Sequence, residues 1–356
     1  MIVLTRQEAR RIAVRAQFLT RDRPRGLSEL VEHLTLLQYD QTSAVAPSAD
    51  LIAWSRLGAS YRPEHLTEAL EDRTFIELKG MIRPYADISL LKARMSAWDD
   101  PDDQFSHPRA HAFVAANADC RRDILSRLDD GGPLPQSELP DTCKVPWSSS
   151  GWNNNRSLTM LLECLASRGE IAIGDRDGRE KLWDLAHRVY PSETVPEPEA
   201  TRIRDERLLH SQGLLRARRG VEAGEPATVK GVRGTWRVDP AYLDLPFAGR
   251  TALLSPLDRL IFDRKRMVDL FEFDYALEMY KPPAQRKWGY WALPILRGDR
   301  LIGKVDATAD HRNRVLRVDA VHQDTPFSSA TDTAVLHEIQ DLANWLGLGL
   351  DLPADF

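Results

Sequence analysis

The sequence predicts an α+β fold, in which tandem winged-helix domains precede a C-terminal β-barrel-like or meander domain. A helix, a turn, a second helix and a hairpin follow one another over residues 121–185, which is the element order of a winged helix. A similar helix-plus-hairpin order recurs over 203–239. Residues 287–322 then alternate strand-like runs with turns, and an apolar-periodic helix over 330–346 follows them.

The N-terminal segment is expected to be mainly helical. Thr5 and Glu8 have the spacing of a capping box, so we expect a helix to begin there. A second helix is expected within 26–40, and an extended stretch containing Gln38 and Asp40 follows it. Its inward-facing residues are expected to be Leu30, Val31, Leu34 and Leu37. The next expected elements are helices at 47–58 and 62–74, a strand-like stretch at 75–88 and a helix at 89–98.

Two segments rich in proline and acidic residues, 98–108 and 190–202, are expected to separate domains. The strand-rich last third of the chain indicates a further boundary near residue 250. The expected domains are an N-terminal winged-helix-like domain at 1–104, a second winged helix at 105–192, a third winged-helix-like segment at 193–250 and a β-barrel-like domain with a closing helix at 251–356.

Composition excludes several classes of protein. The chain has 356 residues, of which 42% are hydrophobic and 28% charged, so it can form a globular core. No stretch reaches the roughly 18 apolar residues of a membrane span, and the start of the chain has no uninterrupted apolar run typical of a signal peptide. Three cysteines without a CxxC motif argue against a disulfide framework. We therefore expect a cytoplasmic protein.

Charge and histidine patterns narrow the partners further. The net charge of −5 does not indicate a polyanion partner for the whole molecule. The charge is unevenly distributed, however, because the segment from Asp319 to Phe356 contains seven acids and no lysine or arginine, whereas basic residues cluster elsewhere. The nine histidines show no HExxH motif and no paired spacing, so we expect no metal and no cofactor.

Three stretches of the chain resemble a known family. They are "LLQYD" before "LIAWSRLG", then "KLWDLAHRVYP", and then the long block from Leu253 to Asp310. Together they resemble the winged-helix DNA glycosylases of the AlkZ/AlkX (YcaQ-like) group over nearly the whole chain. The resemblance implies tandem winged helices with a C-terminal β-barrel-like part around a DNA-binding concavity. It also implies excision of bulky alkylated purines, including those in crosslinks.

The resemblance places the catalytic site at Gln38 and Asp40. The family's signature is Gln-x-Gln in one branch and Gln-x-Asp in the other, and this chain reads Gln38-Tyr39-Asp40. The Gln-x-Asp branch usually adds histidine-containing elements that are missing from the corresponding stretches here. The stretch "LKGMIRPYADI" looks more like an element of the other branch. The chain therefore combines features of both branches.

The chemistry of base excision fits this pair of side chains. In an extended segment residues i and i+2 point to the same side, so Gln38 and Asp40 could reach one water molecule or one sugar. A carboxylate stabilises an oxocarbenium-like state and accepts a proton from attacking water, and an amide can hold that water. The alternative is structural, because an acid just after a helix often forms an Asx turn or a cap.

Basic clusters indicate where DNA phosphates could bind. Within the family-like block they are the run from Arg264 to Arg266 and the pair Arg286–Lys287. Trp288 could stack on a base, although aromatic alternation at this position is also typical of a protein core. The full set of expected DNA contacts is Arg83, Arg264, Lys265, Arg266, Arg286, Lys287 and Trp288.

Two functions remain open from the sequence. The first is a monofunctional DNA glycosylase that acts as a monomer on double-stranded DNA containing N7-alkylated or crosslinked purines, with no membrane partner. The second is a winged-helix DNA-binding protein or transcription regulator without catalytic activity. The second predicts base-reading side chains along a recognition helix, and the helical stretch 155–169 is not rich in such residues on one face.

Overall fold

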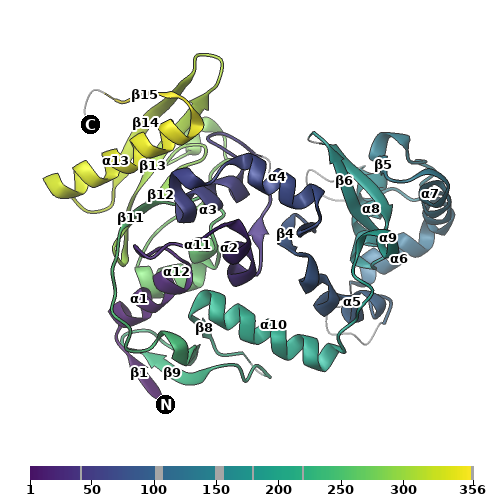
Figure 1. Cartoon of the computed structure of the whole chain (residues 1–356), viewed down its shortest axis with the longest axis horizontal. Helices are drawn as coiled ribbons and strands as arrows, with labels where there is room; N and C mark the ends of the chain where they lie inside the picture. Colours follow the sequence, from purple (N-terminus) through teal and green to yellow (C-terminus); the bar gives the residue numbers. More distant parts are fainter. Residues whose placement is uncertain (41, 101–106, 149–155, 179, 219, 354–356) are drawn as a thin grey trace. The chain divides into compact units, whose positions relative to one another are not determined.

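The computed structural model of the chain contains two compact units (Figure 1). The structure describes all residues except 41, 101–106, 149–155, 179, 219 and 354–356. Unit 1 comprises Met1–Leu66 together with Asp205–Phe356, and unit 2 comprises Thr67–Arg204. The mixture of helices and sheets confirms the predicted α+β class. The four domains expected from the sequence divide the chain differently from these two units, and they stay a prediction.

The N-terminal part of unit 1 forms as its sequence pattern predicts. Thr5 caps helix α1, because its Oγ1 accepts the N–H of Glu8 (3.1 Å) while the Glu8 carboxylate accepts the N–H of Thr5 (2.6 Å). The inward-facing residues expected after it are all fully buried. The elements are β1 (Ile2–Leu4), α1 (Arg6–Ala16), α2 (Leu27–Leu34), β2 (Leu37–Gln38), α3 (Ser48–Leu57) and α4 (Pro63–Glu71).

A four-stranded sheet in unit 1 has the order β1-β9-β10-β8. Its later strands are β8 (Leu214–Arg216), β9 (Glu225–Val229) and β10 (Trp236–Val238). The expected hairpin is present, since β9 and β10 are antiparallel. Strand β1 pairs in parallel with β9, with Ile2 opposite Ala227 and Leu4 opposite Val229. The first strand of the chain is therefore held by residues more than two hundred positions later.

A five-stranded sheet, in the order β11-β12-β13-β14-β15, forms the C-terminal part of unit 1. Its strands are β11 (Thr251–Leu253), β12 (Leu293–Arg297), β13 (Arg300–Asp310), β14 (Val315–Gln323) and β15 (Gly349–Asp351). Within the described residues this order is that of an open sheet. Helix α13 (Ser329–Leu346) contacts β11 and β15, which confirms the expected closing helix.

The strand that was predicted to begin near Lys287 begins later in the chain. Strand β12 starts at Leu293 rather than near Lys287. The reason is local: the backbone N–H groups of Lys287 and Trp288 both donate to a carboxylate oxygen of Glu278, at 2.6 and 2.8 Å. Those donors are then not available to a neighbouring strand.

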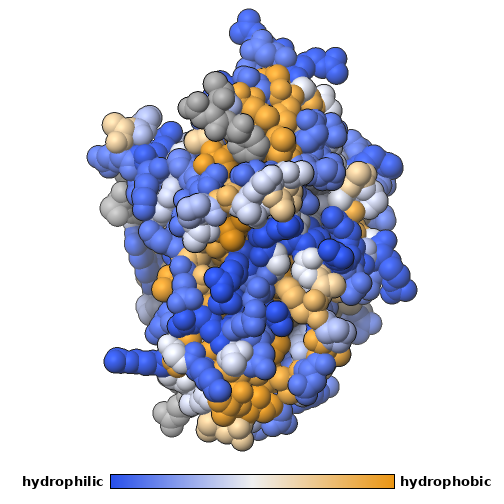
Figure 2. Space-filling model, turned by 90° about the vertical axis from the view of Figure 1, so that its left-hand side faces the viewer, coloured by the Kyte–Doolittle hydropathy of each residue, from blue (hydrophilic) through white to orange (hydrophobic). Residues whose placement is uncertain are grey.

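The core of unit 1 joins its N-terminal helix to segments much later in the chain. Buried Ala9 and Ile12 of α1 share one cluster with Trp236 of β10 and with Met267 and Leu270 of helix α12. The short helix α11 (Arg259–Phe262) precedes α12 (Arg264–Phe271). On the face in Figure 2, hydrophobic residues gather near both the upper and the lower end.

Unit 2 contains the predicted order of helices and a hairpin. Helices α6 (Pro108–Ala116), α7 (Ala118–Gly131) and α8 (Ser157–Ser167) precede the antiparallel strands β6 (Ile171–Asp177) and β7 (Glu180–Leu185), and β5 (Leu134–Pro135) pairs with β7. The stretch 75–88 forms a hairpin of β3 (Phe75–Leu78) and β4 (Met81–Pro84) rather than a single strand. The remaining helices are α5 (Ser89–Ser96), α9 (Ala186–Val189) and α10 (Glu197–Gln212), which continues into unit 1.

The described part of the chain has no helix that combines the length and apolar character needed to cross a membrane. The same described residues contain no group of three or more His, Cys, Asp or Glu side chains arranged to hold a metal ion. The expected loop at 98–108 falls mostly on residues 101–106, outside the described part.

Candidate active site and nucleic-acid interface

The Gln38-Tyr39-Asp40 motif lies at the end of strand β2 and is fastened to helix α3 by one serine. The hydroxyl of Ser48 donates to the carbonyl oxygen of Gln38 (2.6 Å) and accepts the N–H of Asp40 (2.9 Å). The N–H of Ser48 also donates to the carbonyl of Asp40 (3.1 Å). Ser48 is fully buried, so these hydrogen bonds are shielded from water. They fix the main chain at both candidate catalytic residues.

The side chains of the motif are half-buried and thus partly open to solvent. One carboxylate oxygen of Asp40 accepts the N–H of Thr42 at 2.8 Å, which is an Asx turn. Within the described residues this carboxylate makes no other side-chain hydrogen bond, and the amide of Gln38 makes none. One Asp40 oxygen and the whole Gln38 amide therefore remain available to a ligand. Asp40 therefore forms the Asx turn that the structural alternative predicts, and it still has an accessible carboxylate oxygen.

The loop after the motif is anchored to the C-terminal sheet. The carbonyl of Ala44 accepts the N–H of Ala309 in β13 at 2.7 Å. Val45 and Ala46 are buried, at 0% and 5% exposure. The motif therefore lies between two rigid elements, α3 and β13, and a site on such elements is held more precisely than one on a free loop.

Two of the residues predicted to contact DNA lie exposed at the start of α12. Arg264 and Lys265 occupy its first turn, after the N-cap Asp263. Cations at a helix N-terminus oppose the helix dipole, so they do not stabilise the helix that carries them. Their presence is therefore not explained by the stability of the helix.

Arg266 does not fit the predicted role. Its side chain is 1% exposed, and its guanidinium donates to the carbonyls of Gln212 (2.7 Å), Leu214 (3.2 Å) and Leu260 (3.4 Å). Burial lowers the pKa of this guanidinium to about 10. A buried guanidinium that donates to three carbonyls has a structural role. The expected DNA contact by Arg266 does not fit this position.

Trp288 is also part of the core rather than of the surface. It is 7% exposed, and its ring lies against Tyr275, with 6.1 Å between ring centroids. The ammonium group of buried Lys304 lies 4.6 Å from the centre of the same ring. Both observations agree with the core alternative of the sequence analysis, and base stacking by Trp288 does not fit this position.

The neighbouring basic residues remain at the surface. Arg286 is half-buried, with its Nε donating to the carbonyl of Lys281 (3.0 Å) and its guanidinium 4.9 Å from the ring centre of Tyr290. Lys287 is exposed and lies 3.7 Å from Asp274. These contacts leave donors on both side chains that could bind phosphate.

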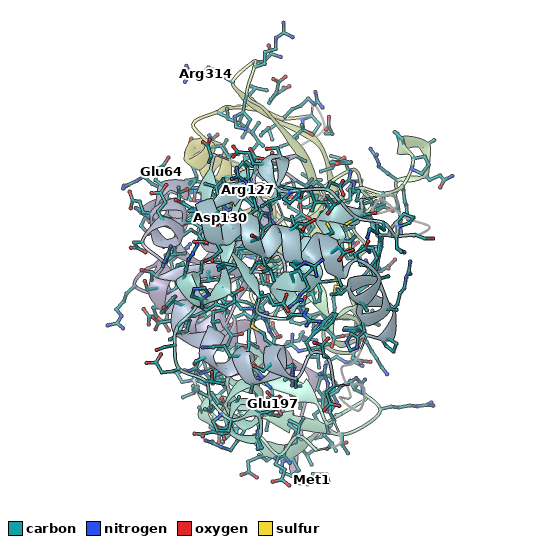
Figure 3. All side chains as sticks on the ribbon, turned by 90° about the vertical axis from the view of Figure 1, so that its right-hand side faces the viewer. Met1, Glu64, Arg127, Asp130, Glu197 and Arg314 are labelled. Carbon is teal, nitrogen blue, oxygen red and sulfur yellow. The ribbon has the colours of Figure 1, made fainter. Side chains whose placement is uncertain are left out.

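The turn between β13 and β14 carries a cationic group that sequence reasoning treated only as a turn. Residues 311–314 are all exposed and include Arg312 and Arg314. Figure 3 shows Arg314 projecting outward at the far end of this hairpin. The Asp310 carboxylate accepts the N–H and the side-chain amide of Asn313 (2.9 and 2.7 Å), which shapes the turn. The signal in the sequence was the pair of arginines beside the turn residues.

Two comparisons with known proteins found matches. The family model for DNA glycosylase AlkZ-like proteins matches residues 31–345, which include Gln38, Asp40 and Ser48. The chain belongs to the AlkZ-like DNA glycosylase family. A solved structure, the Streptomyces sahachiroi DNA glycosylase AlkZ, superposes with a TM-score of 0.64 at 15% sequence identity, over 99% of this chain and 100% of that one. At this identity the likeness establishes the fold, and membership of the AlkZ-like family supports DNA glycosylase activity.

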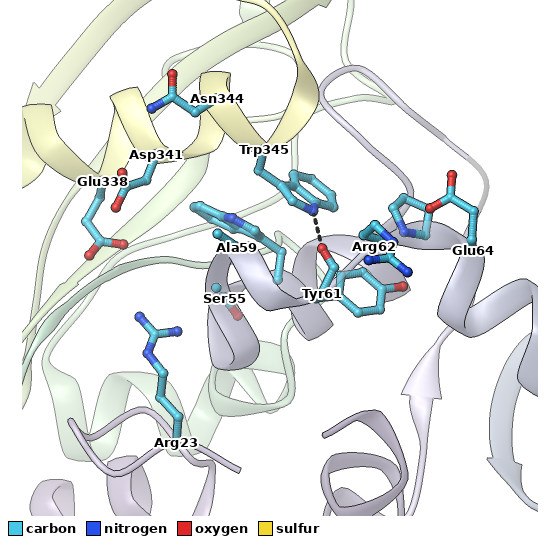
Figure 4. A pocket seen from close by; sticks show the side chains of 13 residues that line it. Arg23, Ser55, Ala59, Tyr61, Arg62, Glu64, Glu338, Asp341, Asn344 and Trp345 are labelled. Carbon is cyan, nitrogen blue, oxygen red and sulfur yellow. Dashed lines mark hydrogen bonds between the residues drawn. The ribbon is translucent and has the colours of Figure 1, made fainter. Parts of the chain in front are cut away.

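A pocket of about 490 Å³ lies elsewhere in unit 1, against α13 (Figure 4). Trp345 stacks on Trp54, with 5.7 Å between ring centroids, and its Nε1–H donates to the carbonyl of Tyr61 (2.9 Å). The charged side chains lining the pocket are Arg23, Arg62, Glu64, Glu338 and Asp341. Because three of these five are carboxylates, the pocket is a poor match for DNA phosphate.

The sequence analysis did not single out Ser48, or Lys79 in the turn between β3 and β4. Ser48 follows a proline at the start of a helical pattern, and that position suggests an N-terminal cap rather than support for a motif eight residues earlier. Lys79 has no other basic residue beside it in the sequence, but it lines the same small pocket of unit 2 as Arg83, which was predicted to contact DNA.

Proposed function

We propose that this AlkZ-like protein is a monofunctional DNA glycosylase that hydrolyses the N-glycosidic bond of bulky N7-alkylated purines in duplex DNA, including purines joined in interstrand crosslinks. One observation carries the proposal. Gln38 and Asp40 present a free amide and an accessible carboxylate oxygen on a main chain fixed by the hydroxyl of buried Ser48.

The proposed step needs only these two side chains. Water attacks C1′ of the sugar, and the bond from C1′ to the base nitrogen breaks with its electron pair going to the purine. Asp40 stabilises the positive charge that develops on the sugar and accepts the proton of the attacking water, while Gln38 holds that water. A purine alkylated at N7 is already cationic, so it leaves as a neutral base without being protonated.

Lyase activity is not part of the proposal. Strand cleavage through a Schiff base requires a lysine amine at C1′. The motif and the helix that follows it, residues 36–57, contain no lysine. We therefore expect abasic sites as the product, with the strand left intact.

We propose that Arg83, Arg264, Lys265, Arg286 and Lys287 contribute to the DNA interface, together with the hairpin tip at 311–314. The five named side chains are exposed or half-buried cations, and the hairpin tip carries the exposed Arg312 and Arg314. We also propose that the helix-plus-hairpin segments act as winged helices and that the protein works as a monomer. The net charge of −5 means that DNA affinity depends on these local clusters, so it should fall steeply with salt.

The decisive experiment incubates duplex DNA containing N7-methylguanine with the protein and measures abasic sites. Asp40→Asn should reduce excision by about 10² to 10⁴-fold, the usual range for a lost general base, with duplex affinity unchanged. Glu32→Gln is the matched control, since it removes an exposed carboxylate from the neighbouring helix α2 and should leave excision unchanged.

The alternative function is DNA binding without catalysis, and the Asx turn at Asp40 is the observation that favours it. In that case Asp40 would only shape the loop. The wild-type protein would then bind duplex DNA and produce no abasic sites, and Asp40→Asn would lower stability rather than activity. Excision by wild type that survives in Asp40→Asn would remove this residue from the mechanism.

A further inference from the structure

A small pocket in unit 2 gathers positive charge. It has a volume of about 190 Å³ and lies between the β3–β4 hairpin, α5 and the start of α6. The described residues that line it are Leu78, Lys79, Arg83, Leu91, Arg94, Met95, Trp98, His107 and Ser167. This lining has two arginines, a lysine and a histidine, and it contains no aspartate or glutamate.

Arg83 is the most confined of these cations. Its Nε is buried and makes no hydrogen bond within the described part of the chain. Burial lowers the pKa of its guanidinium, the charge of Arg204 adds to the effect, and the charge of Asp87 opposes it. A buried donor without a partner destabilises the folded state, so this arrangement does not contribute to the stability of the protein itself.

Lys79, which lines the same pocket, has an unfavourable backbone conformation. The two-residue turn of the hairpin is Lys79-Gly80, with φ of 54° and 68°. Left-handed backbone suits glycine or asparagine and disfavours lysine. Its side chain is exposed at the pocket and has no hydrogen bond or ion pair among the described residues. Desolvation at the pocket and the charge of Arg83 lower the pKa of its ammonium group, and the charge of Glu163 partly offsets this.

The carboxylates nearby are already engaged. Arg94 donates to Glu197 at 2.8 Å, and Arg204 hydrogen-bonds the same carboxylate. Glu197 therefore serves Arg94 of the pocket lining and Arg204, and it makes no hydrogen bond to Lys79 or Arg83 among the described residues. Clustered cations of this kind destabilise a protein unless an anion binds between them.

The walls of the pocket limit the class of anion. Leu78, Leu91 and Met95 supply apolar walls. The ring of Trp98 packs against the ring of His111, with 4.2 Å between ring centroids, and the guanidinium carbon of Arg168 lies 4.9 Å from its centroid. It therefore offers little surface for stacking a base. Drug-sized ligands need about 300–1,000 Å³, and this volume suits one small anion instead.

We propose that the pocket formed by Lys79, Arg83 and Arg94 binds a single phosphate group, and that the phosphate belongs to the DNA backbone. The planar guanidinium of Arg83 and the mobile ammonium of Lys79 match the donors that phosphate oxygens accept. The binding chemistry stands on unit 2 alone. Only the choice of DNA as the source of the phosphate rests on the proposed function.

The first experiment measures thermal unfolding in sodium phosphate and in sodium chloride at equal ionic strength. The wild-type Tm should rise with phosphate, because a ligand that binds the folded state stabilises it. Lys79→Gln and Arg83→Gln should each lose this response. In chloride, Lys79→Gln should be at least as stable as wild type, since one of two repelling charges is removed. Arg127→Gln is the matched control, because it removes an exposed cation from α7 of the same unit (Figure 3).

The second experiment measures duplex DNA affinity as a function of salt for the same variants. Arg83→Gln should weaken binding about tenfold and reduce the slope of log affinity against log salt by about one, as for one lost phosphate contact. A phosphate response lost in the variants with an unchanged DNA slope would rule out DNA as the source. Variants that keep the wild-type phosphate response would overturn the pocket itself. Neither result bears on excision, which the Asp40 variant tests.

Discussion

At the scale of single residues, the candidate site depends on a side chain that takes no part in the proposed chemistry. The hydroxyl of Ser48 bridges the main chain of Gln38 and Asp40, and it is fully buried. A small misplacement of catalytic groups is sufficient to lose much of a rate enhancement. In the proposed mechanism Ser48 is therefore a positioning residue, whose effect is transmitted through the two residues of the motif.

We expect Ser48→Ala to lower kcat for excision about tenfold or more while leaving duplex affinity unchanged. It should also destabilise the fold by about 1–3 kcal/mol, because the N–H of Asp40 loses a buried acceptor. Single-turnover excision and denaturant unfolding measure the two effects. Ser60→Ala is the control, since its hydroxyl makes one hydrogen bond, to the carbonyl of Leu57 (2.9 Å). Equal kcat in both variants would contradict the positioning role.

Asp50, in the first turn of α3, gives the fold a defined pH dependence. Burial raises the pKa of its carboxyl to about 6, although the hydroxyl of Tyr61 donates to it at 2.5 Å. A raised acid pKa contributes stability that is complete below the unfolded pKa of about 3.9 and is lost as pH rises through the folded value. At neutral pH the folded state therefore contains a buried carboxylate.

Asp50→Asn should consequently be more stable than wild type at pH 8, by at most about 3 kcal/mol. The difference in Tm between the two proteins should shrink toward zero as pH falls to 4. Thermal unfolding from pH 4 to 8 measures it, with the exposed Asp341→Asn as the control. A difference that does not change with pH would show that Asp50 titrates normally.

At the scale of helices and strands, a buried ion pair connects α3 to α11. Arg56 and Asp258 are both fully buried, and Nη2 of Arg56 donates to Asp258 at 3.0 Å. Arg56 also donates to the carbonyl of Gln17 (3.1 Å), and Asp258 caps α11 at the N–H of Leu260 (2.9 Å). The pair therefore organises the meeting point of three segments.

Removing one partner should leave the other charge buried and unpaired. We expect Asp258→Ala to destabilise the protein by about 3–5 kcal/mol. The double variant Arg56→Met with Asp258→Leu should recover a large part of that loss, because no charge is then left in the core. Urea unfolding measures both, and Asp319→Ala, which breaks the exposed pair with Arg317, should change little.

The elements show what local sequence can and cannot predict. The capping box of α1, the buried face of α2 and the β13–β14 hairpin follow from patterns within a few residues. The burial of one residue within a charged run cannot be predicted from such local patterns. Successive helical residues point about 100° apart, so of Arg264, Lys265 and Arg266 the third turns into the core while the first two stay outside. The motif at 38–40 could be located, but the serine that holds it depends on tertiary packing.

At the scale of the whole molecule, unit 1 is assembled from both ends of the chain. Trp345, near the end of α13, stacks on Trp54 and donates to the carbonyl of Tyr61. Pairings between such distant segments leave no periodic signal in the sequence, which is why the predicted domains followed chain order instead. Joining the ends makes the C-terminal helix part of the support for the N-terminal motif.

We therefore expect Trp345→Ala to destabilise unit 1 by about 2 kcal/mol through lost ring contacts and an unpaired Tyr61 carbonyl. Excision should fall at temperatures near the lowered Tm and remain normal well below it. Circular dichroism melts and excision assays across temperature measure this. Loss of excision at low temperature with an unchanged Tm would instead assign Trp345 a direct part in the reaction.

The parallel pairing of β1 with β9 also sets an order of events during synthesis. Strand β1 leaves the ribosome before its neighbour β9, because β9 follows the whole of unit 2 in the sequence. Until then the apolar side of α1 has no sheet to cover it, and exposed apolar surface of this kind attracts chaperones and promotes aggregation. Unit 1 can thus close only after β9 has been translated, so pausing between residues 66 and 225 lengthens the time that the apolar side of α1 is exposed.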